Sequence, residues 1–169
     1  MVYTSEYPIL YVTVDVVLLT VRDGELCTLV IRRGGPPYEG RWAFPGGFVE
    51  VDEDLEHAAR RELREETSVS PDDVQLEQLA TYGAPDRDPR HRTISVAWLG
   101  LLPRPSAASA GSDAADAAWQ PVAWLLDDDR LAFDHATILR DALGRVRSRP
   151  ELAHVVSDAV AAEPGEESP

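Results

Sequence analysis

The start of the chain carries two stretches in which β-branched and aliphatic residues dominate. Residues 9–21 and 25–33 are rich in Val, Ile, Leu and Thr, which strands favour. The three residues between them, Arg22-Asp23-Gly24, have the composition of a tight hairpin turn. The pattern therefore predicts two paired strands.

The rest of the chain alternates between strand and helix signals. A Gly- and Pro-rich stretch follows residue 33 and leads to a short strand expected to end at Pro45-Gly46-Gly47. A helix is expected from near Leu55, and Pro71 must end it. Further strands are predicted at 76–82, 93–102 and 119–122, and helical segments from Trp124 and over 134–147. The charged loop 83–92 joins two of these strands.

Length and composition predict a single domain. A chain of 169 residues, 44% of them hydrophobic, can bury a sizeable core. We expect this domain to span residues 1–148, with a flexible loop rich in Ala, Ser and Pro at 103–117. Residues 149–169 are expected to form a helical and then acidic tail with a disordered end.

Charge narrows the functional classes. The formal net charge of −14 argues against a general electrostatic footprint for nucleic acid or anionic lipid. All 16 basic residues other than histidine are arginines, so no lysine is available for a Schiff base or a nucleotide-binding P-loop. The lone Cys27 is expected to be a strand residue in a cytoplasmic protein, and no signal peptide or membrane span is indicated.

Three carboxylates share one sector of the helix that begins near Leu55. At about 100° per residue, Glu66 lies roughly 40° to one side of Glu62 and Glu65 roughly 60° to the other. The same construction places the apolar stripe on nearly the same side and Arg60, Arg61 and Arg64 across from it. Crowded carboxylates beside a core favour a hard divalent cation with oxygen ligands. The alternative is a salt-bridged surface helix.

A longer pattern runs through the same region. The pattern begins at Gly47, reaches Glu53 after five residues and continues after seven more with Arg61-Glu62-Leu63-Arg64-Glu65-Glu66. It resembles the Nudix box. One position departs from that pattern, because Ser68 stands where the family has a glycine. We expect this departure to weaken the end of the helix rather than the chemistry.

The resemblance covers residues 8–147 and implies an α/β Nudix fold, a mixed sheet sandwiched between helices. By analogy with the family, the Gly46 carbonyl, Glu62 and Glu66 would bind Mg²⁺, with Mn²⁺ as a substitute and Glu65 assisting. Glu53 and Arg61 would form an ion pair that fixes the loop against the helix. The implied reaction is hydrolysis of a pyrophosphate bond in a nucleoside diphosphate linked to another group.

Two segments outside the box resemble the branch that includes ADP-ribose pyrophosphatases and nicotinamide-metabolism regulators, namely residues 82–90 and 131–135. Arg87 and Arg90 are candidates to bind phosphates or ribose oxygens, although a charged loop of this kind is as often a solvated connector. Arg41, near the Gly46-Gly47 turn, is a further phosphate candidate. His135 is expected to pack or cap the last helix rather than act as a base.

Several alternatives stay open. A ligand sensor would keep the fold without hydrolysis, and a nucleoside triphosphate pyrophosphohydrolase would use the same box. The regulators of this branch carry a winged helix after the equivalent of residues 131–135, whereas the acidic stretch 149–169 is too short and too negative for that task. The general base is expected among the box glutamates, with Asp113 and Asp116 as the alternative on a later loop. A homodimer through the N-terminal strands is expected.

Overall fold

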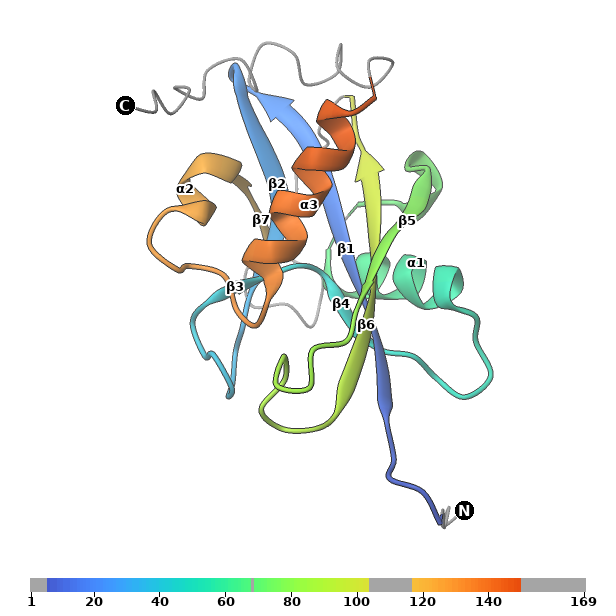
Figure 1. Cartoon of the computed structure of the whole chain (residues 1–169). Helices are drawn as coiled ribbons and strands as arrows, with labels where there is room; N and C mark the ends of the chain where they lie inside the picture. Colours follow the sequence, from blue (N-terminus) through green and yellow to red (C-terminus); the bar gives the residue numbers. More distant parts are fainter. Residues whose placement is uncertain (1–5, 68, 104–116, 150–169) are drawn as a thin grey trace.

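The computed structural model describes residues 6–67, 69–103 and 117–149 of the chain. Its strands form one seven-stranded sheet in the order β3-β2-β1-β6-β5, with β4 added beside β1 and β7 beside β2 (Figure 1). The strands are β1 Tyr11–Arg22, β2 Glu25–Arg32, β3 Trp42–Ala43, β4 Gly46–Phe48, β5 Leu76–Tyr82, β6 Thr93–Leu101 and β7 Ala117–Pro121. The helices are α1 Leu55–Glu66, α2 Val122–Leu126 and α3 His135–Arg147, with a 3-10 turn at Pro71–Asp73.

β1 is the centre of the sheet and makes it mixed. It runs parallel to β6 and antiparallel to both β2 and β4. The β1–β2 hairpin closes at the predicted place, with Arg22 opposite Glu25. Asp23 and Gly24 between them have φ values of 53° and 82°, as a type I′ turn requires. The paired N-terminal strands are therefore confirmed.

Helices cover both faces of the sheet, as Figure 1 shows. The buried side of α1, at Ala58, Ala59 and Leu63, packs in one hydrophobic cluster with Val14 and Leu18 of β1. α2 and α3 belong to a second cluster on the other side, which takes in the alternate β1 residues. The expected α/β architecture, a mixed sheet between helices, is confirmed.

The Gly46-Gly47 pair lies inside a strand instead of ending one. β3 already ends at Ala43, and Gly46–Phe48 forms β4 against Thr13–Asp15 of β1. A Cβ atom on Gly46 would lie 2.1 Å from the carbonyl oxygen of Val14. These glycines are therefore needed for close approach rather than for a turn.

α1 begins and ends close to its expected limits. The Asp54 side chain accepts a hydrogen bond of 2.8 Å from the His57 amide, which caps the first turn. The helix ends at Glu66, before Pro71, and the Thr67 hydroxyl donates to the Leu63 carbonyl. Ser68, most of the loop expected at 103–117 and the tail after residue 149 lie outside the described residues, so their predictions stay untested. Within the described ranges, no helix is long and apolar enough to cross a membrane.

Candidate active site

Glu66 closes α1 against the backbone of β4. Its Oε2 accepts a hydrogen bond of 2.9 Å from the Gly46 amide. Burial raises the pKa of Glu66 to about 7, although the bond from Gly46 opposes this shift. The carboxylate is therefore held beside Gly46 in surroundings that disfavour its negative charge.

Glu62 lies one turn earlier on the same side of α1 and reaches the neighbouring glycine. A Cβ atom on Gly47 would stand 2.3 Å from Glu62 Oε1, so a larger residue would displace this carboxylate. Burial also raises the pKa of Glu62. Both side chains point to the same strand, as the shared helical sector predicted.

Arg61 connects the loop before α1 with the helix. Its Nε and Nη2 donate to the two oxygens of Glu53 at 3.0 and 2.6 Å, and its Nη1 donates to Glu62 at 2.7 Å. A longer bond of 3.2 Å reaches Glu65, and Phe48 offers its carbonyl at 3.1 Å. The hydrogen bonds from Arg61 lower the pKa of Glu53 to about 2.

The helical construction was wrong about the direction of Arg61. It placed Arg61 across from the acids of the helix, whereas the guanidinium bonds to two of them, Glu62 and Glu65, and also to Glu53 of the preceding loop. The Arg side chain is long enough to turn back along the helix surface, and the construction describes only where Cβ points.

A cavity of about 500 Å³ opens over this end of β1 and β4. Its lining includes Gly46 and Gly47 with Glu62 and Glu66, here called the acidic side, and also three arginines, Arg33, Arg87 and Arg90. Glu53 and Glu65 do not line the cavity, and the Glu65 side chain is 52% exposed. The cavity therefore joins acidic and basic surfaces in one space large enough for a nucleotide-sized ligand.

The acidic side fits a divalent cation of the magnesium type. Carboxylates and backbone carbonyls are the hard oxygen donors that Mg²⁺ prefers, and Glu66 and Glu62 both carry a charge that burial disfavours. Across the described ranges, no three His, Cys, Asp or Glu side chains already form a metal cage. Mg²⁺ tolerates such a site because it keeps several water ligands.

The three predicted substrate arginines lie in different surroundings. Arg41 does not line the cavity, and its Nη1 lies 2.7 Å from Asp129 Oδ2 on the surface. Arg90 lines the cavity and is held by two bonds to Asp88, at 3.0 and 2.8 Å. Proximity to Gly46 in the sequence therefore did not bring Arg41 to the cavity.

Arg87 is buried rather than free. Its Nε and Nη2 donate to both oxygens of Asp134, at 3.0 and 2.7 Å, and its side chain is only 4% exposed. Arg90 is also paired, but its side chain remains 37% exposed, whereas that of Arg87 offers almost no surface to a ligand although it lines the cavity. Its geometry favours a role in holding the loop 83–92 over direct contact with a ligand.

Sequence reasoning missed Arg33 and Phe133. Arg33 lines the cavity with its guanidinium 4.7 Å from the centre of the Phe133 ring, and Arg90 lies 5.7 Å from the same ring. Burial and the nearby charge of Arg90 lower the pKa of Arg33. Two guanidiniums therefore lie close together in the cavity despite the negative net charge of the chain. Nothing in the sequence pattern distinguishes Arg33 from its neighbour Arg32.

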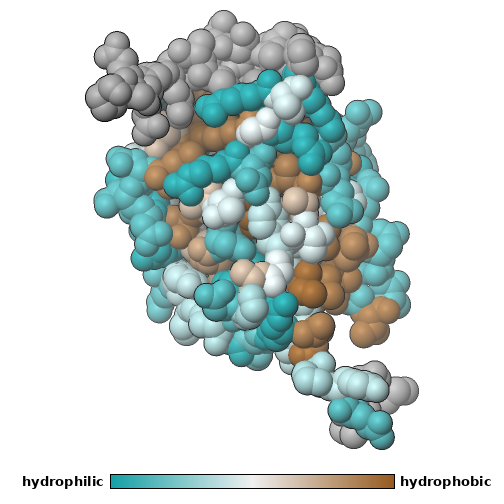
Figure 2. All heavy atoms as spheres, in the orientation of Figure 1, coloured by the Kyte–Doolittle hydropathy of each residue, from teal (hydrophilic) through white to brown (hydrophobic). Residues whose placement is uncertain are grey.

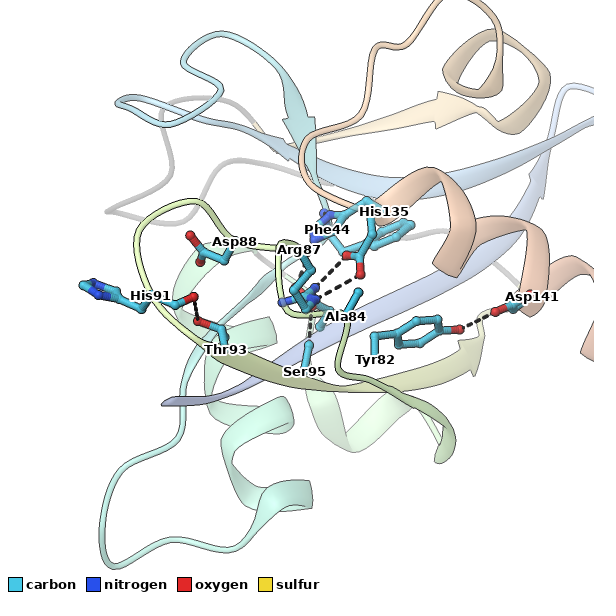
Figure 3. A network of polar contacts seen from close by, with 12 residues as sticks. Phe44, Tyr82, Ala84, Arg87, Asp88, His91, Thr93, Ser95, His135 and Asp141 are labelled. Atoms are coloured by element: carbon cyan, nitrogen blue, oxygen red, sulfur yellow. Dashed lines mark hydrogen bonds and ion pairs between the residues drawn. The ribbon is translucent and has the colours of Figure 1, made fainter. Parts of the chain in front are cut away.

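Asp15 was also missed, because it falls inside a hydrophobic strand. It is 7% exposed, accepts from the Ser95 hydroxyl, and lies 3.4 Å from His135 and 3.6 Å from Arg87. Figure 3 shows His135, Phe44, Arg87 and Ser95 gathered in this buried polar network. A lone acid within a strand pattern is the one signal that could have drawn attention to it.

The stability of the metal-free protein is expected to depend on pH through Glu66. Its folded pKa of about 7 exceeds the ordinary 4.5, so the folded chain holds a proton that the unfolded chain has lost between these values. Stability therefore falls as pH rises through this window, by up to about 3 kcal/mol for this group alone. Urea unfolding in chelator at pH 5 and pH 8 measures the change.

Glu66→Gln provides the comparison, because it removes this titration and leaves the others. The difference in unfolding free energy between the variant and the wild type should change with pH by that amount. A difference that is the same at both pH values would contradict the raised pKa of Glu66.

Comparisons with known proteins show which family the chain resembles. The sequence model of the NUDIX domain family matches residues 10–142. The "ADPR responsive transcriptional repressor NtrR" of Acinetobacter baylyi is 34% identical over 147 residues, which are 86% of this chain and 58% of the repressor. An "ADP-ribose pyrophosphatase" of Methanocaldococcus jannaschii is 41% identical over 113 residues, 67% of this chain and 63% of that enzyme. This chain thus spans about three-fifths of the length of these two relatives.

A solved structure matches the fold as well. The NUDIX domain of Shewanella oneidensis NrtR, crystallised with ADP ribose, superimposes with a TM-score of 0.74 and 35% identity. The match covers 82% of this chain and 90% of that domain.

Proposed function

Because the chain belongs to the NUDIX domain family, we propose that it hydrolyses a pyrophosphate bond in a nucleoside diphosphate linked to another group, with Mg²⁺ as cofactor. ADP-ribose or a similar compound is the proposed substrate. The observation that carries the proposal is the cavity itself, whose lining includes Glu62 and Glu66 together with Arg33 and Arg90. An ion on the acidic side and these arginines would hold the two ends of one charged ligand.

The acidic residues have different parts in this proposal. Mg²⁺ or Mn²⁺ would be held by the carbonyl oxygen of Gly46 and by the carboxylates of Glu62 and Glu66. Glu65 would assist through a water molecule, because its side chain is exposed. When bound, the ion would neutralise phosphate charge and lower the pKa of water. Glu53 and Arg61 would keep the loop 48–54 against α1. The general base is proposed among the box glutamates, since Asp113 and Asp116 lie outside the described residues.

The proposal of ADP-ribose rests on two supports. Three proteins that match two thirds or more of this chain are described as responsive to, acting on or crystallised with ADP ribose. The cavity lining also includes Arg33 and Arg90, which would bind the distal part of such a molecule. A triphosphate needs no such distal site.

A substrate panel tests the reaction. Purified protein with Mg²⁺ should be incubated with ADP-ribose, dinucleotides, nucleotide sugars and nucleoside triphosphates, and the products separated by chromatography. The proposal predicts AMP and ribose 5-phosphate from ADP-ribose. A monophosphate and pyrophosphate from a triphosphate, with ADP-ribose left intact, would favour the alternative of a nucleoside triphosphate pyrophosphohydrolase.

A ligand sensor is the second candidate, and the likeness to the repressor favours it. Hydrolysis is preferred because Glu53, Glu62, Glu65 and Glu66 are all present. Binding of ADP-ribose without turnover, at saturating Mg²⁺, would reverse this preference.

Arg90→Ala is expected to weaken the handling of ADP-ribose specifically. The variant should lose about 1–3 kcal/mol of charge-assisted hydrogen bonding, so kcat/KM for ADP-ribose should fall, and the fall should be smaller for a substrate without the terminal ribose. Arg41→Ala is the matched control, because it removes an arginine that lies outside the cavity. Equal kinetics of the Arg90 variant and the wild type across the panel would make the loop a solvated connector.

We also propose a homodimer as the working form. Apolar side chains are exposed along and beside the N-terminal segment, and Figure 2 shows hydrophobic surface there. They are Tyr7, Ile9, Leu10, Phe48 and Val51. An exposed apolar group of this kind suits a symmetric contact. Light scattering that gives the mass of one chain would contradict the dimer.

Net charge and cysteine content support a proposal about the cellular compartment and the kind of ligand. The net charge of −14 and the single buried Cys27 support a cytoplasmic protein that binds a small nucleotide rather than nucleic acid or membrane.

A further inference from the structure

His135 binds the backbone of the segment that leads into β4. Its Nδ1 accepts a hydrogen bond of 3.0 Å from the Phe44 amide, and its ring stacks on the Phe44 ring at 4.9 Å between centroids. Because Nδ1 is an acceptor, the proton of the neutral ring is on Nε2. Nε2 lies 3.4 Å from Asp15 Oδ1, so this proton faces a carboxylate. Figure 3 shows His135 against Phe44, with Arg87 beside them.

Asp15 in turn lies directly behind Gly46. The two residues are opposite one another in the β1–β4 pairing. A Cβ atom on Gly46 would come 2.9 Å from Asp15 Oδ1. The Gly46 amide also donates to Glu66. His135 and Asp15 therefore contact the same short stretch of backbone, Phe44 to Gly46, that Glu66 contacts through the Gly46 amide.

The same network holds the loop 83–92. Asp134 is the N-cap residue of α3, yet its side chain makes no bond to the helix and pairs with Arg87 instead. An N-cap bond of this kind is usually worth about 1 kcal/mol. Phe133, just before it, has a φ of 54°, which is unfavourable for a bulky residue. The start of α3 thus lacks the usual side-chain cap and contains an unfavourable backbone conformation, and both features accompany the ion pair between Asp134 and Arg87.

We propose that His135 is a positioning residue for the metal site, with Asp15 orienting its imidazole. The bond to Phe44 sets the place of the Gly46 backbone relative to Glu62 and Glu66, so the network determines how well these oxygens bind a divalent ion. The inference rests on the proposed function, because it concerns the same metal. A histidine that merely packs would need no acceptor atom, and an apolar side chain of similar size would serve.

Two substitutions separate positioning from packing. His135→Leu fills the space but leaves the Phe44 amide without its acceptor, whereas His135→Asn keeps an acceptor near the place of Nδ1. The readout is the Mn²⁺ dissociation constant, measured by electron paramagnetic resonance without substrate. Loss of a hydrogen bond to a metal ligand typically costs about 10- to 100-fold in metal affinity. The bond from His135 reaches Phe44, two residues before Gly46, so the Leu variant should bind Mn²⁺ about 10-fold more weakly, at the lower end of this range. The Asn variant should recover most of this loss.

His57→Leu, at an exposed histidine on α1, is the control and should bind Mn²⁺ as the wild type does. Asp15→Asn is the second test should His135→Leu fail to fold, and it should also weaken Mn²⁺ binding because it removes the carboxylate facing Nε2. Wild-type binding in His135→Leu, or in Asp15→Asn, would overturn the inference while leaving the proposed function intact. A wild-type protein that binds no Mn²⁺ would overturn both.

Discussion

Glu66→Gln is expected to lower turnover by a hundredfold or more and to change the fold little. Gln has nearly the same volume, and its side chain can still accept the bond from the Gly46 amide. It cannot supply the negative charge that a divalent cation needs from this position, so the loss should fall on the chemical step. The turnover number at saturating Mg²⁺ and ADP-ribose measures the effect, and circular dichroism checks the fold.

Glu56→Gln is the matched control on the same helix. Glu56 faces away from the cavity and pairs with Arg60 at 2.9 Å. Its loss should leave turnover nearly unchanged, because an exposed i,i+4 pair contributes little. Near-normal turnover in Glu66→Gln, or equal losses in the two variants, would contradict the assignment of the metal site.

Arg87→Leu is expected to destabilise the protein by about 3–5 kcal/mol, because removing one partner leaves buried charge without compensation. Asp134 would lose both of its bonds to the guanidinium, and Asp15 would lose a neighbouring positive charge 3.6 Å away. Urea unfolding near neutral pH measures the change in free energy. The expected loss is therefore one of stability, in contrast to Arg90→Ala, which should act on substrate handling.

A nearby arginine and a second substitution test this explanation. Within the described part of the chain, the guanidinium of Arg92 in the same loop makes two long bonds of 3.4 Å to carbonyl oxygens, so Arg92→Leu should cost much less. Adding Asp134→Asn to Arg87→Leu removes one unpaired charge and should restore part of the lost stability. If Arg87→Leu unfolds at the same urea concentration as the wild type, the buried pair between Arg87 and Asp134 does not stabilise the fold as expected.

Local patterns were sufficient for most of the fold. Residue types alone located the β1–β2 hairpin, and helical periodicity put Glu62 and Glu66 on one side of α1. Local patterns could not predict that β1 pairs with β6, because this parallel pairing joins residues 11–19 and 93–101, which are far apart in the chain. No local pattern specifies such a partner, since it depends on the packing of the whole sheet.

The basic side of the cavity was harder to predict for the same reason. Arg41 is close to Gly46 in sequence, yet it turns to Asp129, which is 88 residues away. Arg87 becomes buried only because α3 brings Asp134 to it. Arg33 enters the site because the strand before it ends at the cavity edge. The role of an arginine depends on its distant partners, whereas the glutamates of α1 are placed by one helix.

The most direct test of the account is hydrolysis of ADP-ribose by the purified protein with Mg²⁺ and with chelator in excess, followed by chromatography of the products. The account predicts AMP and ribose 5-phosphate with Mg²⁺, none in chelator, and recovery of activity when Mg²⁺ or Mn²⁺ is restored. The same products at the same rate in excess chelator would contradict it, and so would tight binding of ADP-ribose that never leads to cleavage.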